Sequence, residues 1–353
     1  MAKASPNAFK KKAGVRPLLV RPGARYTCFG DGLCCTDLHG LGPLTKKEVK
    51  ALRVISEDVV ADADESGFDE PMLQIRNDGG CLFLGEGRCE LHAALGPDAK
   101  PEGCRRFPLG LAATPTGGRI TTRHRCPCRT LGDRPPLDPA AAAPSLTTGG
   151  KLRADRRVGV KVQLEENRKV SFEEYLEIES QMLTRLRRGD DPAEVLAADP
   201  FPELEEDGWK KKARKMFKSA DESRFGAAIQ WFARSVDVLV TSKEQRTPDP
   251  LRWDEAFDRA EARAPEEELG EDVIADWISD EIWSLQWTES GSFARARADL
   301  ATRYAVAADI RQRLEHEGRR PDRAAAEAVA VVDLIGDSEW WEDILPIMEI
   351  DAP

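Results

Sequence analysis

The chain has 353 residues, of which 41% are hydrophobic and 33% charged, and its formal net charge is −11 at pH 7. This length allows two domains, and no apolar window approaches the ~18 residues that a membrane-spanning helix needs. Residues 1–168 carry a net charge of +7 but disperse their basic side chains, whereas residues 169–353 carry −18 and would repel phosphate, so no nucleic-acid partner is expected.

Residues 1–24 are predicted to be an N-terminal extension without a secretory signal. Residues 1–12 are polar and basic, and the longest apolar run after them is Leu18-Leu19-Val20. A secretory signal needs an apolar core of about 7–15 residues. We therefore expect a cytoplasmic protein without a membrane partner, in which clustered thiols serve more often as metal ligands than as disulfides.

All eight cysteines lie between positions 28 and 128, an arrangement that chance would produce about three times in ten thousand. Four thiolates suffice for one zinc ion or one [4Fe–4S] cluster, so eight thiolates match two such sites. No two of these cysteines have the Cys-x2–4-Cys spacing of zinc modules, which favours an iron–sulfur cluster over zinc. The predicted metal ligands are Cys28, Cys34, Cys35, Cys81, Cys89, Cys104, Cys126 and Cys128.

Residues 25–130 are predicted to form a cysteine-rich metal-binding domain of short strands and loops. A capping box formed by Thr45 and Glu48 predicts a helix over 45–55. A short strand is expected over 73–77. Glycine-containing turns predict two hairpins, one over 81–92 and one over 110–125.

Residues 131–150 contain four prolines and three glycines without periodicity, which predicts a linker or a long surface loop. A third hairpin is expected over 158–172, after which residues 151–353 become a mainly helical domain, with the first long helix opening at a second capping box, Ser171 and Glu174. The predicted fold class is therefore α+β, with a small cysteine domain followed by an all-α domain. A short helix is predicted to start at Asp191-Pro192, with proline at its first position. Further helices are predicted near 209–219, 222–243, 253–263, 270–289, 292–316, 321–335 and 338–349.

The cysteine segments together resemble the YkgJ-type cysteine-cluster family, described as a zinc- or iron-chelating domain. Its members open with Cys-x2-Cys-Gly-x-Cys-Cys, which this chain matches except that Asp31 replaces the second cysteine. Aspartate can also ligate iron or zinc, so Asp31 is a further candidate ligand. His92, three residues after Cys89, is another. The matching segments are Cys28 with Gly32, Cys34 and Cys35, then Cys81-Leu-Phe-Leu, Cys89, Cys104-Arg-Arg-Phe-Pro108 and Cys126-Pro127.

Relatives of this family include the flagellin lysine N-methylase, and the resemblance implies an iron–sulfur protein that methylates lysine with S-adenosylmethionine. The helical part would then recognise a protein partner or substrate, and Arg105 and Arg106 would offset the charge of the cluster. No residue is assigned to catalysis or to S-adenosylmethionine. The alternative is a non-enzymatic zinc module whose helical part is an interaction surface, and thiol-based redox sensing is a third interpretation. The sequence contains no glycine-rich phosphate loop, dinucleotide fingerprint or protease motif.

Overall fold

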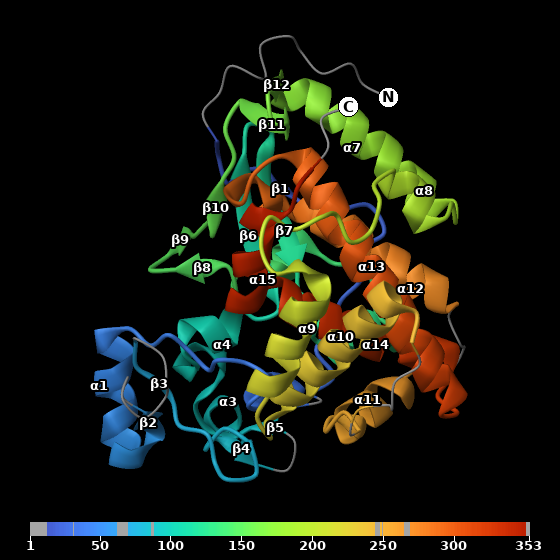
Figure 1. Cartoon of the computed structure of the whole chain (residues 1–353). Helices are drawn as coiled ribbons and strands as arrows, with labels where there is room; N and C mark the ends of the chain where they lie inside the picture. The colour runs from blue at the N-terminus through green and yellow to red at the C-terminus, as the bar shows by residue number, and fades with distance from the viewer. Residues whose placement is uncertain are drawn as a thin grey trace.

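The computed structural model describes residues 13–30, 32–61, 70–85, 88–243, 248, 250–264 and 269–350. The fold is α+β: a large helical part covers a small four-stranded sheet, and a lobe that carries most of the cysteine segments lies beside them (Figure 1). Among the described residues, no helix has the length and hydrophobicity needed to cross a membrane.

The cysteine lobe is built from short elements, as the sequence predicts. The capping box is confirmed, because Glu48 N donates to Thr45 Oγ1 at 3.3 Å and Thr45 N donates to Glu48 Oε2 at 2.8 Å. The hairpin expected over 81–92 is shorter than predicted: the chain turns into a helix at Glu90, where a run of good helix formers begins. The elements are α1 (Lys46–Ile55), β2 (Val60–Ala61), β3 (Met72–Leu73), β4 (Leu84–Gly85), β5 (Arg88–Cys89), α3 (Glu90–Leu95) and α4 (Glu102–Arg106).

The four-stranded sheet has the order β1-β7-β6-β10. Its centre is the predicted hairpin of β6 (Leu109–Thr114) and β7 (Gly117–Thr122), which pair antiparallel, while β1 (Leu18–Leu19) and β10 (Arg156–Arg157) run parallel to their neighbours at the two edges. Side chains at Gly117 and Gly118 would collide with the backbone of Pro17 and Val15, so these glycines allow the N-terminal edge strand to approach.

Residues 131–150 carry buried apolar side chains. Leu131 packs into the main hydrophobic core, while Leu137 and Leu146 pack with Leu111 and Ile120 of the sheet. Here the chain forms α6 (Pro139–Ala142), preceded by α5 (Pro127–Thr130), and then the small hairpin of β8 (Thr147–Thr148) and β9 (Lys151–Leu152). These contacts hold the segment against both the sheet and the helices.

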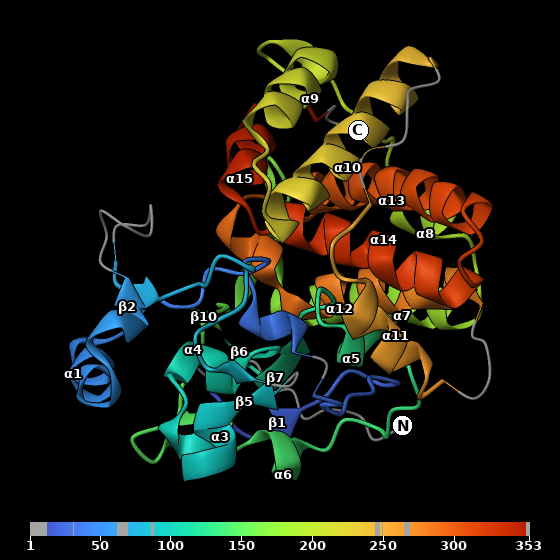
Figure 2. The ribbon, with the colours of Figure 1, turned by 90° about the horizontal axis from the view of Figure 1, so that it is seen from below.

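The second part consists of the predicted third hairpin followed by helices close to the predicted positions. Helix α14 lies at the centre, buried along its length, and packs on α10, α12 and α13. Helix α12 lies between α14 and strand β7, so it joins the helical part to the sheet (Figure 2). The elements are β11 (Lys161–Glu165), β12 (Arg168–Ser171), α7 (Phe172–Arg187), α8 (Pro192–Leu196), α9 (Gly208–Ser219), α10 (Arg224–Thr241), α11 (Asp254–Glu261), α12 (Gly270–Ser284), α13 (Phe293–His316), α14 (Pro321–Gly336) and α15 (Glu339–Ile344).

A buried charge cluster joins the sheet to α12. Asp280, 3% exposed, accepts from Arg21 Nε at 2.5 Å and from Arg129 Nη2 at 2.7 Å, and the His124 ring nitrogen Nε2 lies 2.9 Å from its carboxylate. Thr122 also donates to Asp280, and Asp276 one turn earlier accepts from both arginines. His124 is thus a buried side chain with a polar partner.

This cluster predicts loss of stability in acid. Burial alone would raise the pKa of Asp280, but Arg21 and Arg129, with the His124 contact, hold this pKa well below its ordinary value. A lowered pKa in the folded state contributes stability that is complete above the unfolded pKa and disappears as pH falls through the folded value. Urea unfolding should therefore show stability that declines below about pH 5, with a smaller decline in Asp280→Asn. An identical decline of stability in the wild type and in Asp280→Asn would show that Asp280 is not the source of the acid sensitivity.

Candidate metal centre

Cys34 and Cys35 lie on a 3-10 turn, Leu33–Cys35, that follows Gly32. Gly32 has a φ of 80°, a conformation that glycine adopts without strain, and it lets the backbone enter the turn. The two sulfur atoms lie 3.9 Å apart. An extended chain would point these neighbouring side chains in opposite directions, whereas the helical turn brings both sulfurs to one region.

Three more cysteines lie close to this turn. Cys81 is buried, and its N–H donates to the carbonyl of Cys35 at 2.8 Å. Cys89 pairs with Leu84 in the β4–β5 hairpin, and Cys104 lies on α4. Cys35, Cys81, Cys89 and Cys104 belong to one hydrophobic cluster of the lobe. We call Cys34, Cys35, Cys81, Cys89 and Cys104 the five-thiol group.

Lys100 is a cation within electrostatic range of the five-thiol group. Burial alone would lower the pKa of Lys100, but the negative charges of Cys34, Cys35, Cys104 and Cys89 outweigh it and raise this pKa. Burial raises the pKa of Cys104 to about 12, with Lys100 opposing the rise and neighbouring thiols adding to it. The pKa shifts of Lys100 and Cys104 thus indicate that one ammonium group and several sulfurs share a poorly solvated region.

A second set of thiols lies near Tyr26. The backbone N–H of Phe29 donates to Cys128 Sγ at 3.1 Å, which brings the segment of Cys28 beside α5. Burial raises the pKa of the Tyr26 hydroxyl, and the charges of Cys126, Cys28, Cys128 and Cys34 raise it further. The charge of Cys34 raises the pKa of both Tyr26 and Lys100, so Cys34 lies within electrostatic range of both residues. We call Cys28, Cys126 and Cys128 the three-thiol group.

The sequence named four other residues for this site: Asp31, His92, Arg105 and Arg106. Asp31 falls outside the described residues. His92 is exposed on α3, and its carbonyl accepts from Gly96 N at 2.9 Å. Arg106 donates to Asp155 Oδ1 at 2.6 Å, and Arg105 to the carbonyl of Thr147 at 3.5 Å. The two arginines therefore bond to the 147–155 segment, and the cation beside the thiols is one that sequence reasoning missed.

Lys100 and Tyr26 carried no recognisable signal in the sequence. Lys100 lies four residues before Cys104 in Ala-Lys-Pro, and Tyr26 two residues before Cys28, but neither spacing is a motif. Only the folded chain brings Cys35 and Cys104 into one hydrophobic cluster, and the charges of both act on the pKa of Lys100. A search for single lysines or tyrosines within a few residues of the cysteines could have proposed both.

The thiols fit a soft metal by their chemistry, because thiolates prefer zinc, copper(I) and iron–sulfur clusters. Within the described ranges, however, no group of three or more histidine, cysteine, aspartate or glutamate side chains is arranged to hold a metal ion. The five thiols are thus gathered in one region without the geometry of a finished coordination shell.

Comparisons with known proteins return no match: no family model, no curated protein and no solved structure matches this chain. The resemblance described above therefore rests on the quoted cysteine segments alone, and the metal and activity that it implies stay predictions.

Proposed function

We propose that the chain is a thiolate-ligated metal protein whose five-thiol group holds an iron–sulfur cluster. The observation that carries the proposal is the convergence of five cysteines from four separate segments on one region beside Lys100. Four of these thiolates would satisfy a [4Fe–4S] cluster, and the fifth would remain in the hydrophobic cluster of the lobe.

Lys100 would compensate the charge of such a centre. Four thiolates around a cluster concentrate negative charge in a poorly solvated place, which is costly without a nearby cation. A buried ammonium group lowers that cost and also influences the reduction potential of the cluster. Lys100 belongs to the same lobe as the thiols and lies four residues before Cys104. It would therefore stay near the thiolates when they bind the metal.

The three-thiol group would form a second metal position. Cys126 and Cys128 are buried, Cys28 is exposed, and Cys34 lies near enough to act on the same tyrosine. Three thiolates with a fourth donor are a usual shell for zinc or a cluster. Because Cys34 faces both groups, it would be the ligand that connects the two positions.

Replacing Cys104 by serine is expected to remove most of the iron. The wild-type protein, purified without oxygen, should be brown and contain iron and acid-labile sulfide. The serine variant should lose most of both, because thiolates stabilise a cluster far better than hydroxyls do. His92→Gln is the matched control, since this exposed side chain lies on α3 next to Cys89 and should not change the metal content. The measurements are iron, zinc and sulfide content with the visible absorption spectrum.

Two results would contradict the proposal. A colourless protein with stoichiometric zinc and no sulfide would exclude the cluster and favour the zinc module. Full iron content in the double variant Cys81→Ser/Cys104→Ser, which leaves only three thiols in the five-thiol group, would show that this group is not the ligand set. Methyl transfer to lysine, which the family resemblance implies, is a separate prediction, and calorimetric titration of S-adenosylmethionine into the metal-loaded protein tests it.

A further inference from the structure

A cavity of about 300 Å³ lies between the cysteine lobe and the helices α10 and α11. One wall comes from the lobe and includes Gly32, Leu33, Thr36, Gly80 and Leu84. The opposite wall comes from the start of α10 and from the segment that leads into and along α11. The charged residues that line the cavity are Arg76, Arg224, Arg252, Arg259, Asp78 and Glu255.

The charge of this cavity differs in sign from that of the whole chain. Four arginines and two acidic residues line it, which leaves a formal net charge of +2 in a protein whose net charge is −11. Arginine presents a planar fork of donors that matches the oxygens of phosphate and carboxylate groups. A cavity with this lining favours a small dianion.

Backbone carbonyls orient three of the four guanidinium groups. Arg76 Nη1 donates to the carbonyl of Leu84 at 2.8 Å, Arg224 Nε to that of Arg252 at 2.9 Å, and Arg252 Nη1 to that of Glu222 at 2.7 Å. A carbonyl fixes the direction of a guanidinium without cancelling its charge. The positive charge is therefore held in place and stays available to an anion.

Two acidic residues at the rim of the cavity compete only weakly with an anionic ligand for the arginines. Asp78 pairs with Arg76 at 3.1 Å and Glu255 pairs with Arg259, but the carboxylate side chains are 65% and 82% exposed. Exposed ion pairs contribute little to stability, so the oxygens of a ligand can replace them. Asp37 is different, since it is mostly buried and holds Arg224 Nη1 at 2.8 Å. Arg224 thus links the two walls while the other arginines face the ligand.

Two consecutive glycines make room for this arrangement. A side chain at Gly79 would collide with the guanidinium of Arg224 and the carboxylate of Asp37, and one at Gly80 would collide with the guanidinium of Arg76. Gly79 also has a φ of 79°, which other residues rarely adopt. The Gly79-Gly80 pair therefore leaves room for the guanidinium groups of Arg224 and Arg76.

We propose that this cavity binds a small molecule that carries a phosphate group. The phosphate would take the position between Arg76, Arg252 and Arg259, and the apolar surface of Leu33, Leu84 and Ala256 would contact the rest of the molecule. The volume lies at the lower end of the range for small-molecule sites. This proposal does not rest on the metal centre, although the two sites are neighbours. The backbone of Thr36 pairs with that of Gly80 at the cavity, and the N–H of Cys81 donates to the carbonyl of Cys35 directly beside it.

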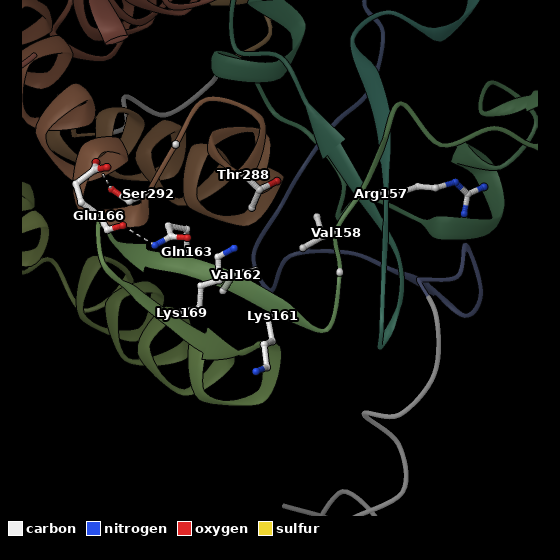
Figure 3. Close-up of a pocket in the computed structure, with 11 residues that line it drawn as sticks. Arg157, Val158, Lys161, Val162, Gln163, Glu166, Lys169, Thr288 and Ser292 are labelled. Carbon is white, nitrogen blue, oxygen red and sulfur yellow. Dashed lines mark hydrogen bonds between the residues drawn. The ribbon is translucent and has the colours of Figure 1, made fainter. Parts of the chain in front are cut away.

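A second, larger cavity of about 480 Å³ provides the control. It lies beside β11 and is also lined by basic residues, among them Arg157, Lys161 and Lys169 (Figure 3). Figure 3 shows that these three side chains lie apart from one another instead of converging on one point. Lys161 and Lys169 are exposed. This cavity has a comparable charge, but its basic side chains lie apart, so it separates binding at the proposed site from a general attraction of anions to positive charge.

The test is calorimetric titration of the full chain, as purified, with inorganic phosphate and with adenosine monophosphate at constant ionic strength. We expect saturable binding that weakens at least tenfold in the double variant Arg252→Gln/Arg259→Gln and stays unchanged in Lys161→Gln/Lys169→Gln. Tighter binding of the nucleotide than of phosphate would support use of the apolar wall, and equal binding would support a site for the phosphate group alone.

Three outcomes would overturn the proposal. They are the absence of saturable binding of either probe at millimolar concentration, unchanged affinity in the arginine double variant, and loss of binding in the lysine control. The two arginines are surface side chains, so both variants should unfold at the wild-type temperature. If the double variant does not, Arg252→Gln alone provides the same comparison, because its side chain is exposed. Iron and sulfide content, measured on the same samples, reports separately on the metal centre.

Discussion

Replacing Asp280 by asparagine is expected to lower the free energy of unfolding by about 3–5 kcal/mol near neutral pH. The substitution keeps the size of the side chain but removes the charge that Arg21 and Arg129 share. Arg129 is fully buried, and Asp276 alone would then face two guanidinium groups. A buried charge without full compensation is costly, because it has lost its hydration.

The matched control is Asp272→Asn, on the exposed side of the same helix, α12. It should change the free energy of unfolding by less than about 1 kcal/mol, since it alters only the favourable effect of an acid near a helix N-terminus. Urea unfolding followed by circular dichroism provides both values. Equal effects of the two substitutions would show that the Asp280 cluster does not hold α12 to the sheet.

Replacing Trp341 by alanine is the second large effect, with an expected loss of about 3–5 kcal/mol. Trp341 is fully buried on α15 and meets the ring of Phe232 edge to face at 5.3 Å between centroids. Its Nε1 donates to Asp299 Oδ1 at 2.7 Å. The variant would leave a cavity between α9, α10 and α15 and remove one hydrogen bond from a buried carboxylate.

The adjacent residue, Trp340, supplies the control. Trp340 is partly exposed and contacts Lys215 Nζ at 5.6 Å from its ring centre, so Trp340→Ala should cost less than about 1 kcal/mol. Thermal or urea unfolding of the two variants, measured side by side, gives the difference directly. A loss at Trp340 as large as that at Trp341 would contradict the burial of only one of them.

Local patterns predicted much of the secondary structure. The capping boxes at Thr45 and Ser171 begin helices at the expected positions, and proline after Asp191 begins α8. These signals succeed because their hydrogen bonds join residues three apart or fewer. The Trp340-Trp341 pair follows a local rule too, since adjacent residues of a helix cannot both face one core and only Trp341 is fully buried.

The sequence was less informative where the burial of a residue depends on segments that are distant along the chain. Leu137 and Leu146 lie in a stretch whose prolines and glycines predict a surface loop, yet both leucines are buried. The turn residues set local backbone direction, whereas the sheet beneath supplies the apolar surface that covers these side chains. A prediction from periodicity cannot detect single buried side chains of this kind.

The sequence by itself determined where the cysteines of this protein lie, all eight within its first 128 residues, and that helices follow them. Only the tertiary structure decided how the thiols divide into groups of five and three, that Lys100 and Tyr26 face them, and that Arg106 instead pairs with Asp155. The physical reason is distance along the chain. Helix caps and turns depend on neighbouring residues, whereas charge compensation depends on which remote side chains share a buried volume.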